Sequence, residues 1–227
     1  MNTGTMAGSG VPARVWAGYY LVFCALWALI ELVGREPVVE WLGSETAALG
    51  HIVVVKTLVW VVPAVILIRR FEPSLRVSLK EMFTARVRWG PALIGFGVFT
   101  FWVASALGAH WPAQGLVVTF PLVGVVRGVF AGVQEEIVFR GWLCNAMPNW
   151  GNWKGYLASG ALFAVIHVPA WVKNPSQVEG WACLYTPLSL VFFGALLAWV
   201  FAKGRNLVVP IVLHSWYDLA LAALPVN

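Results

Sequence analysis

The sequence predicts an all-α membrane protein with about seven transmembrane helices. Hydrophobic residues make up 60% of the 227-residue chain and charged residues only 11%, whereas a soluble domain has about 25% charged residues. A helix needs about 20 mostly apolar residues to cross the hydrocarbon core of a bilayer. We therefore expect a multi-pass protein whose first partner is the lipid bilayer. The candidate runs lie near residues 15–33, 51–68, 89–109, 115–138, 155–172, 184–202 and 206–224.

The first three runs form an N-terminal part, residues 1–114, in which we place no motif. The polar start MNTGTMAGSGVPAR lacks the basic flank and cleavage site of a secretory signal, so we expect the first run to be retained as an anchor. The charges in GREPVVEWLGSE indicate an interfacial loop or a short surface helix after the first run.

The distribution of lysine and arginine predicts how the chain crosses the membrane. The segment RRFEPSLRVSLKEMFTARVR, between the second and third runs, is strongly basic and should be cytoplasmic by the positive-inside rule. The N-terminus then lies in the cytoplasm. The same rule accounts for the net charge of +5, and we expect no nucleic-acid partner. We expect the protein to reside in a bacterial or archaeal cell membrane.

The fourth run contains two adjacent carboxylates, Glu135 and Glu136, in the stretch VVRGVFAGVQEEIVFRGWL. An acidic residue at the centre of a membrane helix costs roughly 2.5–3.5 kcal/mol on insertion scales, so the pair should face the bundle interior and serve a function. Glu136 and Arg140 are four residues apart and can pair on one helix face. Glu135 is rotated by about 100° from that face, and we expect it to be free to take up a proton. The helix is expected to continue to about residue 147.

Two later runs contain further acid and imidazole groups. His167 follows Phe163 by four residues in FAVIH, and Asp218 follows His214 by four residues in HSWYD. Carboxylates and imidazoles are the usual groups for proton transfer, and two Glu with two His would also suit zinc or a pair of metal ions. The chain lacks the HExxH helix of zinc proteases and the GxSxG elbow of serine hydrolases.

These three patterns together resemble a known family. EEIVFR, FAVIH and HSWYD match, in order, the EExxxR, FxxxH and HxxxN/D motifs of the CPBP family, which contains the CAAX prenyl endoproteases and bacteriocin-processing homologues. Its members are viewed as glutamic-type intramembrane proteases. The resemblance covers residues 115–224 and implies a catalytic helical core over residues 115–227. Asp218 stands where the prenyl proteases typically have Asn.

The resemblance also implies roles for the motif residues. Glu135 with His167 would activate a water molecule, and His214 would stabilise the oxyanion, with Asp218 orienting it or helping directly. Glu136 and Arg140 would hold the site together, supported by Phe163. We expect the catalytic groups to line one water-filled cavity that opens toward the cytoplasmic half.

The expected function is that of an intramembrane endopeptidase without a cofactor. It would hydrolyse a peptide bond of a membrane-associated protein or peptide: a CAAX-type, leader, pheromone or sorting-tail substrate, lipidated or not. A zinc-dependent protease built on the same residues, a non-proteolytic membrane partner such as an immunity protein, and a proton-coupled transporter are the alternatives. The absence of paired half-helix repeats argues against a transporter.

Overall fold

The computed structural model of the protein describes residues 10–109 and 121–223, and every regular element within these two ranges is a helix. The all-α prediction is confirmed. The start of the predicted fourth run, residues 115–120, lies outside the described residues, as does the predicted boundary between the N-terminal part and the catalytic core.

The N-terminal part contains two long helical rods, a basic connection and one further helix. The first rod comprises residues 13–42 and the second rod comprises residues 44–71. The first rod continues through the charged stretch after Ile30 and ends only at Gly43, whose φ of 80° breaks the helix. The charges therefore do not make a loop there. The elements are α1 (Ala13–Leu29), η1 (Ile30–Gly34), α2 (Arg35–Leu42), α3 (Ser44–Gly50), η2 (His51–Val55), η3 (Thr57–Val61), α4 (Val62–Phe71), η4 (Glu72–Ser74), α5 (Leu79–Thr84) and α6 (Trp89–Ala109).

The described C-terminal part, residues 121–223, contains four long helical segments. The fourth run begins at Leu122, after Pro121, and continues past the carboxylates through a π-helical stretch, with helical residues to Ala146 as predicted. The elements are α7 (Leu122–Glu136), η5 (Ile137–Cys144), α8 (Trp153–Val165), α9 (Val168–Lys173), η6 (Pro175–Val178), α10 (Ala182–Gly204) and α11 (Val208–Ala223).

Within residues 10–109 and 121–223, five helical segments are long and apolar enough to cross a membrane, and the protein is an integral membrane protein. The α7–η5 helix is of similar length but carries four charged residues, and α11 has only 16 residues. The count of seven crossings therefore stays a prediction. The five segments are Ala13–Leu42, Thr46–Ser74, Trp89–Gly108, Trp153–Lys173 and Ala182–Gly204.

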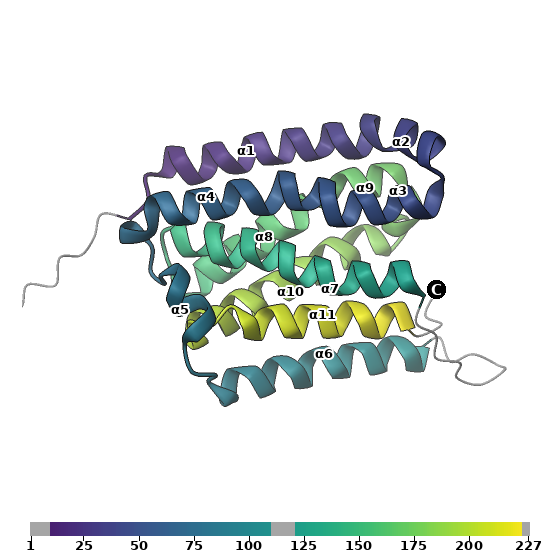
Figure 1. Ribbon diagram of the computed structural model, residues 1–227. Helices are drawn as coiled ribbons and strands as arrows, with labels where there is room; N and C mark the ends of the chain where they lie inside the picture. Colours follow the sequence, from purple (N-terminus) through teal and green to yellow (C-terminus); the bar gives the residue numbers. More distant parts are fainter. Residues whose placement is uncertain (1–9, 110–120, 224–227) are drawn as a thin grey trace, which may run out of the picture.

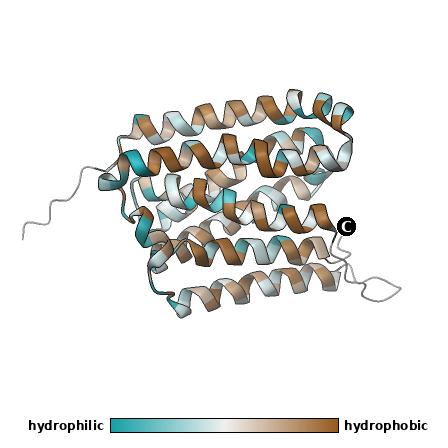
Figure 2. Ribbon diagram, viewed as in Figure 1, coloured by the Kyte–Doolittle hydropathy of each residue, from teal (hydrophilic) through white to brown (hydrophobic). Residues whose placement is uncertain are grey.

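The long helices lie side by side in one bundle with two distinct ends (Figure 1). The short helix α5 marks one end, which we call the basic end because it carries the predicted cytoplasmic segment. Helices α2, α3 and α9 mark the opposite end, which we call the α9 end. Figure 2 shows apolar positions along the long helices and hydrophilic positions concentrated around α5.

Polar contacts fix the basic end. The side-chain oxygen of Asn145 accepts hydrogen bonds from the backbone N–H groups of Arg76 and Val77, each at 3.0 Å. Arg205 donates from Nε to Glu81 at 2.5 Å. These bonds tie the basic segment to the end of the α7–η5 helix and to the turn between α10 and α11.

Small residues allow the helices around the motifs to approach closely, as is common at membrane helix interfaces. A Cβ atom on Gly132 would lie 2.1 Å from Oγ of Ser215, so α11 contacts the backbone of α7 one turn before the carboxylates. A Cβ atom on Gly160 would lie 2.1 Å from the carbonyl oxygen of Val191, where α8 crosses α10. This packing brings the motif-bearing helices together.

Candidate active site

Arg140 and Glu136 form the expected pair in the centre of the bundle. Both side chains are 0% exposed, and Nη1 of Arg140 lies 2.7 Å from Oε1 of Glu136. Nη2 donates to the carbonyl oxygen of Gly194 at 2.9 Å, and the guanidinium lies 4.9 Å from the ring centroid of Phe163. Arg140 therefore joins the fourth run to α8 and α10.

His214 is held by the same carboxylate. Its Nδ1 lies 2.8 Å from Oε1 of Glu136, across the close α7–α11 contact. A carboxylate only accepts, so Nδ1 carries a proton and the ring turns Nε2 toward Glu135. Nε2 lies 3.9 Å from Oε2 of Glu135 and 3.6 Å from Oδ2 of Asp218. Glu136, rather than Asp218, makes the hydrogen bond that orients His214.

His167 lies where α8 gives way to α9. Pro169 has no N–H to donate to the carbonyl of Val165, so the regular helix is interrupted at this point. Nδ1 of His167 lies 2.8 Å from the carbonyl oxygen of Phe163. Because a carbonyl only accepts, Nδ1 carries the proton and Nε2 remains an acceptor.

The motif residues line one small cavity. Glu135, His167, His214 and Asp218 contribute to a cavity of about 100 Å³, with Phe163 in its wall. A single water molecule has a share of about 30 Å³ in the liquid, so there is room for a few waters. The other lining residues are Trp102, Ser189, Leu190, Phe193 and Tyr217.

The direction in which this cavity lies differs from the expectation. Trp102 is in the second half of α6, Ser189 is in the first half of α10, and Tyr217 is in the second half of α11. These parts of the helices lie toward the α9 end (Figure 1). The cavity is therefore not on the side of the basic segment, because Glu135 is near the middle of a helix that runs on to Ala146. Its opening toward the cytoplasmic half stays a prediction.

Lys56, in the second rod, is a site residue that the motifs do not contain. Its Nζ lies 2.5 Å from Oε1 of Glu135. Glu135, which we expected to be free to take up a proton, is therefore paired with a lysine. The sequence does hold a signal for Lys56, since a lysine inside the apolar run HIVVVKTLVWVV is as costly in a membrane as the carboxylates are.

A second, polar cavity of about 320 Å³ lies beside Lys56, toward the α9 end. Glu31 is buried there and accepts from His51 at 2.7 Å and from Arg35 at 3.3 Å. Arg127 also lines this cavity, two turns before Glu135, and forms no ion pair within the described part of the chain.

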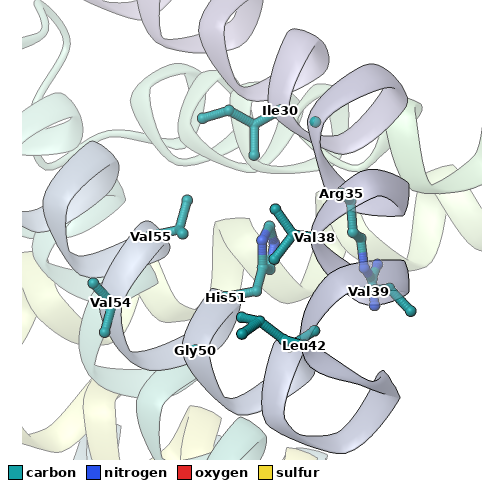
Figure 3. A pocket seen from close by; sticks show the side chains of 11 residues that line it. Ile30, Arg35, Val38, Val39, Leu42, Gly50, His51, Val54 and Val55 are labelled. Atoms are coloured by element: carbon teal, nitrogen blue, oxygen red, sulfur yellow. The ribbon is translucent and has the colours of Figure 1, made fainter.

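A further cleft of about 390 Å³ separates the first two rods (Figure 3). Its walls are mostly apolar, with Val38 on one side and Val55 on the other, and none of the motif residues lines it. The candidate catalytic residues therefore do not border this larger space.

The side chains that could act as metal ligands, two Glu and two His, offer limited support for a metal site. Among residues 10–109 and 121–223, no group of three His, Cys, Asp or Glu side chains is close enough together to hold a metal ion. Glu135, one of the four candidate ligands, already has an ammonium group against one of its oxygens.

A helical membrane bundle with buried carboxylates and imidazoles around a water-sized cavity has the make-up of a membrane-embedded hydrolase. Residues 117–220 match the family described as type II CAAX prenyl endopeptidase Rce1-like. This region is slightly under half of the chain and contains all three motifs, and over it the chain is similar to this family of CAAX-type membrane proteases. The family inferred from the motifs is thereby confirmed. No curated protein and no solved structure shows a significant match to the chain.

Proposed function

We propose that the protein is a glutamic-type intramembrane endopeptidase in which Glu135 and His167 activate a water molecule. The observation that carries this proposal is the shared cavity. Glu135, His167 and His214 come from three separate membrane segments, yet all three line the same space of about 100 Å³. Catalytic groups must converge on one reacting position, and these groups meet that requirement.

In the first step the water oxygen bonds to the carbonyl carbon of the scissile peptide, and the water gives up one proton. Oε2 of Glu135 faces His214 rather than Lys56 and is the oxygen available to accept that proton. Nε2 of His167 is the second acceptor at the cavity. A positioned base of this kind contributes about 10²–10⁴-fold to the rate.

His214 stabilises the negative charge on the carbonyl oxygen of the tetrahedral intermediate. Since Nδ1 donates to Glu136, Nε2 can donate to an oxyanion only when the ring is a doubly protonated imidazolium. Glu135, Glu136 and Asp218 surround the ring and balance its positive charge. Donors aimed at a developing oxyanion typically contribute about 10²–10³-fold to kcat.

The intermediate collapses when the C–N bond breaks. The leaving nitrogen takes the proton that Glu135 accepted from water, which restores the carboxylate. Glu136 and Arg140 do not touch the substrate in this scheme. They hold His214 and the helices around it in place.

For the substrate we infer a CAAX-type peptide that is associated with the membrane, following the description of the family. Leader, pheromone and sorting-tail peptides are the alternatives. A prenylated peptide, the same peptide without its lipid, and an unrelated membrane peptide distinguish these possibilities when the products are identified by mass spectrometry.

The mechanism is tested with purified protein and the Glu135→Gln variant. We expect the folded fraction of this variant to lose at least about 10²-fold in kcat. Glu179→Gln, which changes an exposed glutamate, is the matched control and should retain wild-type turnover. Near-wild-type turnover of Glu135→Gln would overturn the assignment of the base.

A further inference from the structure

Lys56 is a cation buried in the membrane-length part of the second rod. Its side chain is 13% exposed, and ionisable groups at this depth are rare and usually functional. It belongs to the N-terminal part of the chain, outside the region that matches the family. Its contacts therefore indicate what this part contributes to the site.

One contact holds the lysine itself, and two hydrogen bonds hold the rod around it. Its ammonium group lies 4.3 Å from the ring centroid of Trp60, one turn further along the same rod, where a cation–π contact is favourable. The residue before Glu135, Gln134, donates to the carbonyl oxygen of Ile52 at 2.9 Å and to Oγ1 of Thr57 at 2.8 Å. These hydrogen bonds fix the position of the second rod along α7 on both sides of Lys56.

The two oxygens of Glu135 have different surroundings. Oε1 accepts from Lys56 at 2.5 Å, while Oε2 lies 3.9 Å from Nε2 of His214, beyond hydrogen-bond distance. The ammonium group thus fixes the plane of the carboxylate and leaves one oxygen for the cavity. Without it, the carboxylate could rotate toward the polar cavity that Lys56 also lines.

We propose that Lys56 is the positioning residue for Glu135: it binds Oε1 and presents Oε2 to the water in the catalytic cavity. The proposal rests on the proposed role of Glu135 as the base. Lys56 acts through Glu135 and does not touch the substrate. The N-terminal part of the chain thereby completes a site whose motif residues all lie in the C-terminal part.

The test compares Lys56→Met, which keeps most of the stem but removes the charge, with Lys56→Arg, which keeps the charge. Lys80→Met, at an exposed lysine of the basic segment, is the matched control. For the folded, monodisperse fraction of each variant we measure kcat, KM and the melting temperature with one peptide substrate.

We expect Lys56→Met to lower kcat about 100-fold, the usual effect of misplacing a catalytic group by about 1 Å, with KM unchanged. Lys56→Arg should recover part of the lost kcat, and Lys80→Met should match the wild type. A merely structural pair would lower the melting temperature and the folded yield while the folded fraction kept its wild-type kcat. That result would overturn the proposal.

Two further variants, Lys56→Gln and Glu135→Gln, complete the test. If Lys56→Met does not accumulate, Lys56→Gln removes the charge but keeps a hydrogen-bond donor, and the same loss of kcat is expected; a wild-type kcat would refute the proposal. Glu135→Gln distinguishes the role of Glu135 as the base from the role of Lys56 in positioning it. An inactive Glu135→Gln beside a fully active Lys56→Met refutes only the role of Lys56, whereas an active Glu135→Gln refutes the base and with it the positioning role.

Discussion

Replacing Arg140 by alanine removes the cation that faces Glu136 in the centre of the bundle. Both side chains are 0% exposed and lie 2.7 Å apart, so water cannot take the place of the lost partner. Breaking a buried pair by removing one member costs about 3–5 kcal/mol. For chains of 150–250 residues, where 1 kcal/mol corresponds to about 2–4 °C, this predicts a fall in melting temperature of about 6–20 °C.

Activity should fall as well, because Glu136 also orients His214. Arg140→Lys should rescue the melting temperature only in part, since a point charge replaces a planar fork that also reaches the carbonyl of Gly194. Arg127→Ala is the matched control for stability: this arginine is exposed on the same helix, and its loss should change stability by no more than about 0.5 kcal/mol.

The assay is thermal unfolding in detergent, followed in parallel with peptide cleavage. Equal melting temperatures for the wild type and Arg140→Ala would refute the reasoning and would move Arg140 from a structural role to substrate binding. A double variant, Glu136→Gln with Arg140→Met, should unfold at a higher temperature than Arg140→Ala, because no charge is then left without its partner.

Three other outcomes follow from the structure. Gly132→Ala should lower folded yield and activity, because its Cβ would lie 2.1 Å from Oγ of Ser215, while Gly97→Ala, with nothing within 4 Å, should be neutral in size-exclusion and cleavage assays. Removal of metal ions by chelation should leave cleavage intact; loss of activity that zinc restores would favour the metal-dependent alternative. The hydrogen bond from Arg205 lowers the pKa of Glu81 from 4.5, so the difference in melting temperature between wild type and Glu81→Gln should be largest above pH 4.5 and vanish as the pH falls below it.

The sequence is sufficient to find the residues at the centre of the site. Ionisable side chains are costly to place in a membrane. This cost alone, without a structure, identifies Glu135, Glu136, His167 and His214 as candidates. The spacing of four residues predicts the pair of Glu136 and Arg140 correctly, because partners within one helix depend only on helical geometry. The length of the α7–η5 helix is predictable for the same reason.

Partners on different helices are not predictable in this way. The resemblance to the family implies that Asp218 orients His214 or helps directly, yet Oδ2 of Asp218 lies 3.6 Å from Nε2 of the ring, whereas Oε1 of Glu136 lies 2.8 Å from Nδ1. Glu136 makes the bond because Gly132 lets α11 approach α7 closely, and such an approach depends on the packing of the whole bundle. Lys56 is missed for the same reason. The sequence shows that a lysine in this apolar run is costly to place in a membrane, but it does not show that the lysine contacts Glu135 on another helix.

The orientation of the bundle sets two sequence-based expectations against each other. The positive-inside rule assigns the basic end to the cytoplasm, whereas the catalytic cavity lies toward the α9 end. If the rule holds, the site is reached from the outer half of the membrane. If the site faces the cytoplasm, the arginines and lysines of residues 69–88 lie outside.

Labelling of single cysteines in intact cells decides between these arrangements. Cys183 is exposed and Cys24 is half-buried, so both are first replaced in a Cys24→Ser, Cys183→Ser background, in which only the buried Cys144 remains. Ser176→Cys then places a thiol on the exposed turn at the α9 end, and Thr84→Cys places one on the exposed basic segment. We expect a membrane-impermeant maleimide to label Ser176→Cys in intact cells and Thr84→Cys only after lysis. The reverse pattern would show that the positive-inside rule fails for this chain, and that its substrates reach Glu135 from the cytoplasm.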